Sequence, residues 1–226
     1  MAKQQNPLSS FYRSPKLYTK LPSLGKYYAS DIIDMPENGE LPVFAMTAKD
    51  ELLMKNPDAL LNGEAVIQVI QSCIPPIKNA SKMLSADIDT LLVAIQGATY
   101  GDDLEVTGTC DKCQSEARGI ASVEVALETM QELGDSYIVD ELGLQIAIKP
   151  FSYSSTIKAG LTNFQSTRSL QGIAEIEDDQ ERLKLFNQNF RKVADLNFDL
   201  ILDAVDSISG ENDDGEFIVN DREQIA

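Results

Sequence analysis

The sequence has no histidine and no tryptophan, and only three cysteines among its 226 residues. The lack of histidine excludes Ser-His-Asp and Cys-His catalytic sets and every histidine-ligated metal site. Three cysteines cannot build a dense disulfide framework, which suits a reducing compartment such as the cytosol. Each class of protein that depends on histidine or on several disulfides is therefore excluded.

Positive charge is also scarce. The chain carries 19 Lys and Arg against 36 Asp and Glu, a formal net charge of −17 and a pI near 4.3. General nucleic-acid binding depends on clustered Lys and Arg, so this balance argues against it. No window approaches the roughly 18 apolar residues of a membrane span, and no apolar run fits a signal peptide. We expect no nucleic acid and no membrane among the partners.

Apolar residues make up 43% of the chain, enough for a folded core in one large domain or two small ones. The bases are concentrated at the start. Residues 1–30 contain five Lys or Arg and no acid, which leaves −22 for the rest of the chain. They also contain four of the seven tyrosines, and their prolines and serines favour an extended segment over a helix.

Two interpretations of this segment stay open: a frayed terminus, or an arm whose aromatic and basic side chains hold an acidic neighbouring surface. We favour the arm, because exposed aromatic side chains are costly in water. Deleting residues 1–30 is then expected to leave a folded domain that no longer assembles. The candidate interaction residues are Phe11, Tyr12, Arg13, Lys16, Tyr18, Lys20, Lys26, Tyr27 and Tyr28.

Three short helices are expected after the arm and after a strand at Leu41–Met46. Thr47 is a suitable N-cap for the first, which Pro57 and Asp58 interrupt. The second carries apolar residues at helical spacing from Gly63 to Cys73, and two prolines end it. The third starts with Ser85 as its cap and ends at Gly101.

After Gly101, apolar and polar residues alternate with a period of two, which predicts strands. One hairpin is expected around Leu104–Val106 and 117–125, with Cys110 and Cys113 at its tip. Two further strands are expected at Tyr137–Val139 and Leu142–Ile148.

Helical periodicity dominates the last part of the chain up to about Ser209. The pattern predicts helices at Phe151–Leu170 and Leu183–Val205, an acidic turn at Gly210–Glu216, and a strand at Phe217–Val219. Asn220 and Glu223 resemble a helix start, so we expect the natural chain to continue beyond Ala226.

Together these elements predict an α+β fold in four parts. They are an extended basic and aromatic arm (1–40), a helical subdomain (41–102), an antiparallel β region with the cysteine hairpin (103–150), and a helical C-terminal region (151–226).

The Cys110-x-x-Cys113 pair is the clearest chemical motif. A zinc site needs two more ligands, and Cys73 could supply one of them. A redox pair usually sits between a strand and a helix, whereas this pair is expected between two strands. An ordinary hairpin tip is favoured over a zinc site completed by another chain and over a redox pair.

Several acidic groups invite a metal interpretation and do not support it. The turn Glu211–Glu216 places glycine where a calcium loop needs its first carboxylate, so a solvated turn is expected. Asp195, Asp199 and Asp203 form one stripe of a helix, expected to face outward as a solvated face or a docking strip for a basic partner. Asp87 needs no role beyond favouring its helix start.

No paired acid and base, activated nucleophile or glycine-rich phosphate cradle is present, since Leu21–Tyr28 lacks the second glycine of such a loop. We expect no enzyme activity, no cofactor and no small-molecule substrate.

A series of short motifs in order is distinctive. It runs through Leu21-Pro-Ser-Leu-Gly-Lys-Tyr-Tyr28, Leu41-Pro-Val-Phe-Ala-Met46, Cys73-Ile-Pro-Pro76, Asp87-Ile-Asp-Thr-Leu-Leu92, Tyr100-Gly-Asp102 and Cys110-Asp-Lys-Cys113. The series resembles the baseplate (hub) protein family of T-even-like contractile-tailed bacteriophages over about residues 16–125.

The resemblance implies a structural subunit of the virion tail baseplate, assembled in the host cytoplasm. Its expected partners are other baseplate or hub proteins and copies of itself. The alternative is a hub assembly chaperone that does not stay in the virion, since high negative charge also suits transient docking. A small zinc or redox module is a third possibility.

Overall fold

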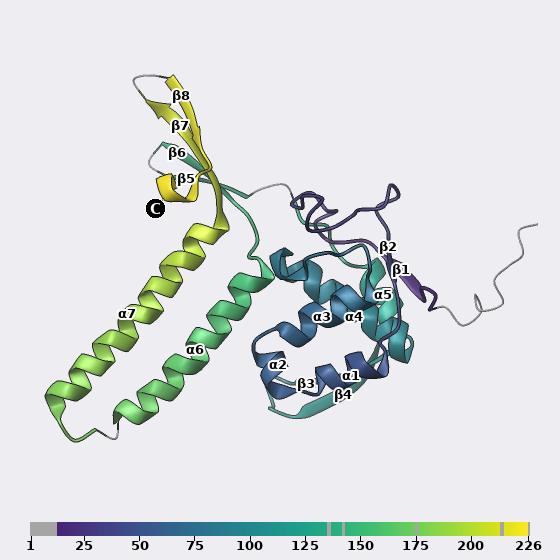
Figure 1. The fold of residues 1–226 in the computed structure, drawn as a ribbon, viewed down its shortest axis with the longest axis horizontal. Coiled ribbons are helices and arrows are strands. Elements are labelled where there is room, and N and C mark those ends of the chain that lie inside the picture. Colours follow the sequence, from purple (N-terminus) through teal and green to yellow (C-terminus); the bar gives the residue numbers. More distant parts are fainter. Residues whose placement is uncertain (1–12, 135–136, 142, 175, 213–214, 226) are drawn as a thin grey trace, which may run out of the picture.

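The structure is a computed structural model that describes residues 13–134, 137–141, 143–174, 176–212 and 215–225. The molecule has three parts: a helical body, a pair of long helices, and a small sheet at one end of that pair, whose strands come from the chain before and after the two helices (Figure 1). Helices and small antiparallel sheets occur together, which confirms the predicted α+β class.

The body begins with two short antiparallel strands and continues as helices. Thr47 caps the first helix with a full capping box, because its hydroxyl accepts from the Asp50 N–H and the Asp50 carboxylate accepts from the Thr47 N–H. The elements are β1 (Leu17–Thr19), β2 (Leu41–Val43), α1 (Ala48–Met54), α2 (Pro57–Leu61), α3 (Glu64–Cys73), η2 (Ala80–Lys82) and α4 (Ser85–Tyr100).

Three expected boundaries in the body differ. The strand expected through Met46 ends at Val43. Pro57 does not only interrupt a helix: it opens α2, with Asn56 as N-cap, because proline fits the first helical position. The N-cap of α4 is Leu84, without a side-chain cap bond, and Ser85 is the first helical residue.

The core lies between α3, α4 and the two strands. Its side chains are at most 9% exposed and include Leu21, Ile33, Leu41, Val43, Val66, Val69, Ile70, Cys73, Ile74, Ile77, Met83, Ile88, Leu91, Ala94 and Ile95. Burial of this many apolar side chains, each worth about 1.5–3 kcal/mol, is the main stabilising contribution to the body.

Residues 13–40 pack on the body and do not extend from it. Leu17 of β1 pairs with Val43 of β2, Leu21 is 1% exposed, and Ile33 forms an isolated bridge with Ile77. The expected extended arm is wrong for these residues, because their apolar side chains complete the core. Residues 1–12, with the predicted contacts Phe11 and Tyr12, lie outside the described residues.

A long hairpin and a short helix follow. Strands β3 (Asp103–Thr109) and β4 (Glu116–Ser122) pair with Cys110 and Cys113 in the connecting turn, as predicted. The expected strand through Val125 is wrong after Ser122, whose hydroxyl accepts from the Val125 N–H and caps α5 (Val123–Glu128).

The remaining strands form one four-stranded antiparallel sheet in sequence order. They are β5 (Tyr137–Glu141), β6 (Leu144–Ile148), β7 (Val205–Asn212) and β8 (Gly215–Val219). The strands expected within 103–150 are thus divided between two sheets. The prediction of helix beyond Ala204 is wrong, because β7 begins at Val205 and pairs with β6 and β8. Gly210 packs closely there, since a Cβ would lie 2.8 Å from a Leu144 methyl.

Between β6 and β7 the chain forms two long helices, α6 (Tyr153–Ala174) and α7 (Asp179–Ala204). They lie side by side and antiparallel (Figure 1), joined by a hydrogen bond from the Asn189 amide to the Ser166 hydroxyl at 2.9 Å. The last element is α8 (Arg222–Ile225), beside the end of α7.

Candidate functional site

Arg13 is the first predicted contact residue that the structure places, and it binds its own chain. Its guanidinium donates to the carbonyls of Ser72, at 2.9 Å, and Ala45, and it lies 5.5 Å from the Phe44 ring centre. It also donates to the Cys73 sulfur, while burial raises the pKa of that thiol. Arg13 therefore fixes the start of the described chain to α3.

Tyr28 also binds within its own chain, through a hydrogen bond to a buried carboxylate. Asp87, the third residue of α4, is 0% exposed and accepts from the Ser23 N–H at 3.0 Å, the Ser23 hydroxyl and the Tyr28 hydroxyl. The Tyr28 oxygen in turn accepts from the Leu84 N–H at 2.8 Å. Burial raises the pKa of Asp87 and that of Tyr28. Asp87 ties the loop after β1 to α4, a role that its place at a helix start did not reveal.

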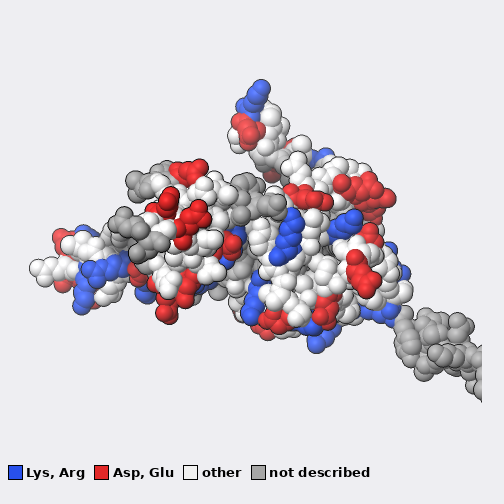
Figure 2. Space-filling model, turned by 90° about the horizontal axis from the view of Figure 1, so that it is seen from above, with Lys and Arg blue, Asp and Glu red and all other residues white. Residues whose placement is uncertain are grey.

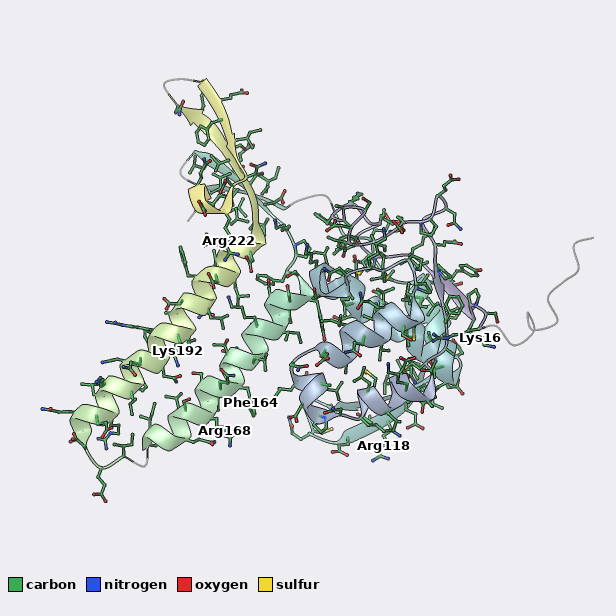
Figure 3. The ribbon with its side chains drawn as sticks, viewed as in Figure 1. Lys16, Arg118, Phe164, Arg168, Lys192 and Arg222 are labelled. Atoms are coloured by element: carbon green, nitrogen blue, oxygen red, sulfur yellow. The ribbon has the colours of Figure 1, made fainter. Side chains whose placement is uncertain are left out.

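The other predicted contact residues lie nearer the surface. Lys16, Tyr18, Lys20 and Lys26 are exposed and Tyr27 is half-buried. Tyr18 is 59% exposed, on the outer face of β1. Lys16 lies beside β1, at the side of the body away from the helix pair (Figure 3).

Tyr18 and Lys20 line a groove between β1 and α5, with a volume of about 610 Å³. Gly97 of α4 and the buried Val123 of α5 meet under it so closely that a Cβ on Gly97 would lie 2.6 Å from a Val123 methyl. Carboxylates dominate its rim: Glu40, Asp102, Glu124, Glu128 and Glu132. The groove is thus acidic and partly apolar, and sequence reasoning missed it because it joins segments about 100 residues apart.

The cysteine pair stands apart from the third cysteine. Cys110 and Cys113 are exposed at the tip of the β3–β4 hairpin, whereas Cys73 is buried in α3. A hydrogen bond with the Ser115 hydroxyl lowers the pKa of Cys113. Cys73 therefore cannot complete a zinc site with the pair, and no group of three potential ligands forms within the described residues.

The aspartate stripe of α7 faces other parts of its own chain. Asp199 accepts from Lys158 of α6 at 2.8 Å and from Arg222 of α8 at 3.2 Å. Asp203 accepts from Arg222 and from the Ser155 hydroxyl at 2.9 Å. Hydrogen bonding to Lys158 lowers the pKa of Asp199. The basic partner of this strip is internal at these two positions, and the expected outward, solvated face fits only Asp195.

Part of the acidic turn is strand. Glu211 lies on β7 and pairs with Glu216 of β8. The two residues between Asn212 and Gly215 lie outside the described residues. The expected turn over Gly210–Glu216 is therefore wrong for its described residues, which belong to β7 and β8.

The helix pair exposes large apolar side chains. On α7 these are Leu183, Phe186, Phe190, Phe198 and Ile201, and on α6 they are Phe164 and Leu170. Basic side chains gather at the far end of the pair, away from the sheet (Figure 2). In the parts of the chain that are described, no helix has the length and apolarity to cross a membrane.

These features define a protein built around a small core, with charged and apolar side chains exposed on its surface. Residues 16–224 match the model of a family described as T4 bacteriophage base plate protein. The match spans most of the chain, so the protein belongs to this family of phage baseplate proteins, as the motif series predicted. No curated protein and no solved structure matches it.

Proposed function

We propose that this protein is a non-enzymatic structural subunit of the tail baseplate of a contractile-tailed phage, in the hub or next to it. It is assembled in the host cytoplasm and stays in the virion, held by other baseplate proteins and by copies of itself. The observation that carries the proposal is the family match over residues 16–224. The exposed apolar side chains of α6 and α7 support it, because such surfaces are typical of proteins that bind partners.

Part of the predicted contact set remains available for this role. Lys16, Tyr18 and Lys20 present their side chains outward, whereas Arg13 and Tyr28 stabilise the body. Deleting residues 1–30 would remove β1 and the buried Leu21, so that deletion is expected to unfold the body, contrary to the expectation from sequence. Substitution of the exposed residues is the appropriate test.

Quantitative mass spectrometry of purified particles tests the proposal. A structural subunit is present in a fixed ratio to the other baseplate proteins. Absence from particles, with presence in assembly intermediates, contradicts the proposal and supports the assembly chaperone, for which the charge of −17 is equally suitable.

A variant with Lys16→Glu, Tyr18→Ala and Lys20→Glu tests the contact surface in phage complementation. We expect a folded protein that enters particles poorly, because it loses two cations and an exposed aromatic side chain. Lys55→Glu, a change at the exposed C-cap of α1, is the control. Normal incorporation of the triple variant contradicts a role for these three residues.

A further inference from the structure

The first half of α7 carries a basic surface on a chain whose formal net charge is −17. Residues 182–192 include Arg182, Lys184, Arg191 and Lys192 and contain no acid. Arg182 pairs with Asp179. The other three cations are exposed and make no ion pair within the described part of the protein.

The same stretch of α7 also carries exposed apolar side chains. Leu183, Phe186 and Phe190 are spaced three and four residues apart, which places them on one face of the helix, and they are 61%, 47% and 65% exposed. A hollow of about 540 Å³ at the same end is lined by Leu183 and Phe186 of α7 and by apolar residues of α6. Two exposed phenylalanines one turn apart are costly in water, so this face is suited to burial against another surface.

The groove between β1 and α5 has the complementary character. Five carboxylates surround it, and Lys20 is the only base in its lining. None of Glu124, Glu128 and Glu132 makes an ion pair within the described ranges. The lining also includes apolar side chains from β1, the following loop, α5 and the residues after α5, among them Leu17, Leu24, Leu127 and Met130.

These two surfaces cannot meet in one molecule. β1 and α5 lie on the side of the body away from the helix pair, and the basic half of α7 lies at the far end of that pair (Figure 1). Lys16, near the groove, and Lys192, on α7, mark the two sides in Figure 3.

We propose that the basic, apolar half of α7 in one copy docks into the acidic groove between β1 and α5 of a second copy. Phe186 and Phe190 supply the buried apolar area, and the pairing of Lys184, Arg191 and Lys192 with carboxylates sets the register. Each copy then uses one surface as donor and one as acceptor. Such a head-to-tail contact closes into a ring or extends as a chain. The inference rests on the proposed function, in which copies of the protein contact one another.

Analytical ultracentrifugation of the full-length protein, up to about 100 µM and at low and high salt, tests this contact. Two triple variants reverse the charge of one side of the contact each. One is Lys184→Glu, Arg191→Glu, Lys192→Glu on α7, and the other is Glu124→Lys, Glu128→Lys, Glu132→Lys at the groove. We expect the wild type to self-associate, more weakly at high salt, and each variant alone to lose at least about tenfold in affinity. An equimolar mixture of the two variants should associate again, because each α7 then faces a groove of opposite charge.

The matched control is Lys49→Glu, Lys55→Glu, Lys112→Glu, which changes the net charge by the same amount as the α7 variant at exposed positions elsewhere. Circular dichroism verifies that all variants fold. A monomeric wild type, a control as weak as the α7 variant, or a mixture that does not associate each overturns the proposal. A monomeric wild type whose α7 variant is missing from particles overturns self-docking in favour of another baseplate protein on this face. In that case the proposed structural role still stands, because particle mass spectrometry measures it independently.

Discussion

The body and the long helix pair differ in how many of their large apolar side chains they bury. Nearly all fully buried apolar side chains belong to residues 21–98, and within the described residues Leu196 is the single one after residue 130. The pair instead leaves five large apolar side chains of α7 in solvent. Two helices side by side can bury only one stripe of each, so an α7 that is apolar on a second face has an unsatisfied surface.

This contrast indicates how the two parts divide the work. The body has an apolar core of its own, and its polar anchors, Arg13 and Asp87, close the chain onto that core. The helix pair depends more on its surroundings, which suits a subunit that becomes fully packed only in an assembly.

The sharpest test of the contrast is a pair of large-to-small substitutions. Leu91→Ala removes a fully buried side chain from α4 and should lower the free energy of unfolding by about 2–5 kcal/mol. Phe190→Ala removes an exposed ring and should change it by less than about 0.5 kcal/mol. Urea denaturation of the isolated protein measures both. Equal losses would show that the helix pair contributes as much to stability as the body.

The second test concerns the buried Asp87. Asp87→Asn should cost about 1–3 kcal/mol, because it replaces one of the two oxygens that accept from the Ser23 N–H, the Ser23 hydroxyl and the Tyr28 hydroxyl with an NH₂ group, which cannot accept.

The effect of Asp87 also depends on pH. Since burial raises its pKa in the folded state, ionisation opposes folding, and its contribution is largest below about pH 4 and declines as pH rises through the raised value. The cost of Asp87→Asn should therefore shrink with rising pH in denaturation curves. Asp103→Asn, at an exposed position, is the control. A cost that grows with pH contradicts the assignment.

The third test is at the groove floor. Gly97→Ala places a methyl group against Val123 and should cost about 1–3 kcal/mol, because α5 must move. Gly160→Ala on α6 is the control, since a Cβ there meets nothing within 4 Å. Thermal unfolding compares the two, and a Gly97→Ala protein as stable as the control would mean that α5 is not held against α4.

The smallest effect is expected at the end of the chain. Arg222→Ala removes the ion pairs that join α8 to Asp199 and Asp203 and should cost about 0.2–1 kcal/mol, since all three groups are partly exposed. Hydrogen exchange should accelerate in α8 and not in the body. Unchanged exchange would show that α8 is held by other contacts.

The helical part of the fold was predictable from sequence because its signals are local. Thr47 as an N-cap, the apolar spacing of α3 and the glycine after α4 predicted most helices of the body. Period-two alternation predicted β3 to β6.

The predictions that were wrong concern features that depend on contacts between segments distant in the sequence. Residues 13–40 read as an arm because their charge and prolines are visible, whereas the burial of Leu21 and the bonds to Asp87 require α4. β7 was hidden behind a helical pattern, although Val205 and Ile208 are β-branched and need only a neighbouring strand to pair. The acidic groove could not be found by any local signal.

Hydrogen exchange measured on the full-length protein, free in dilute solution and within isolated baseplates, tests the central claim most directly. We predict slow exchange of α4 in both states, and new protection within baseplates at residues 182–194 of α7 and 123–132 around α5. Baseplates that contain the protein without any gain of protection on α7 would contradict the account.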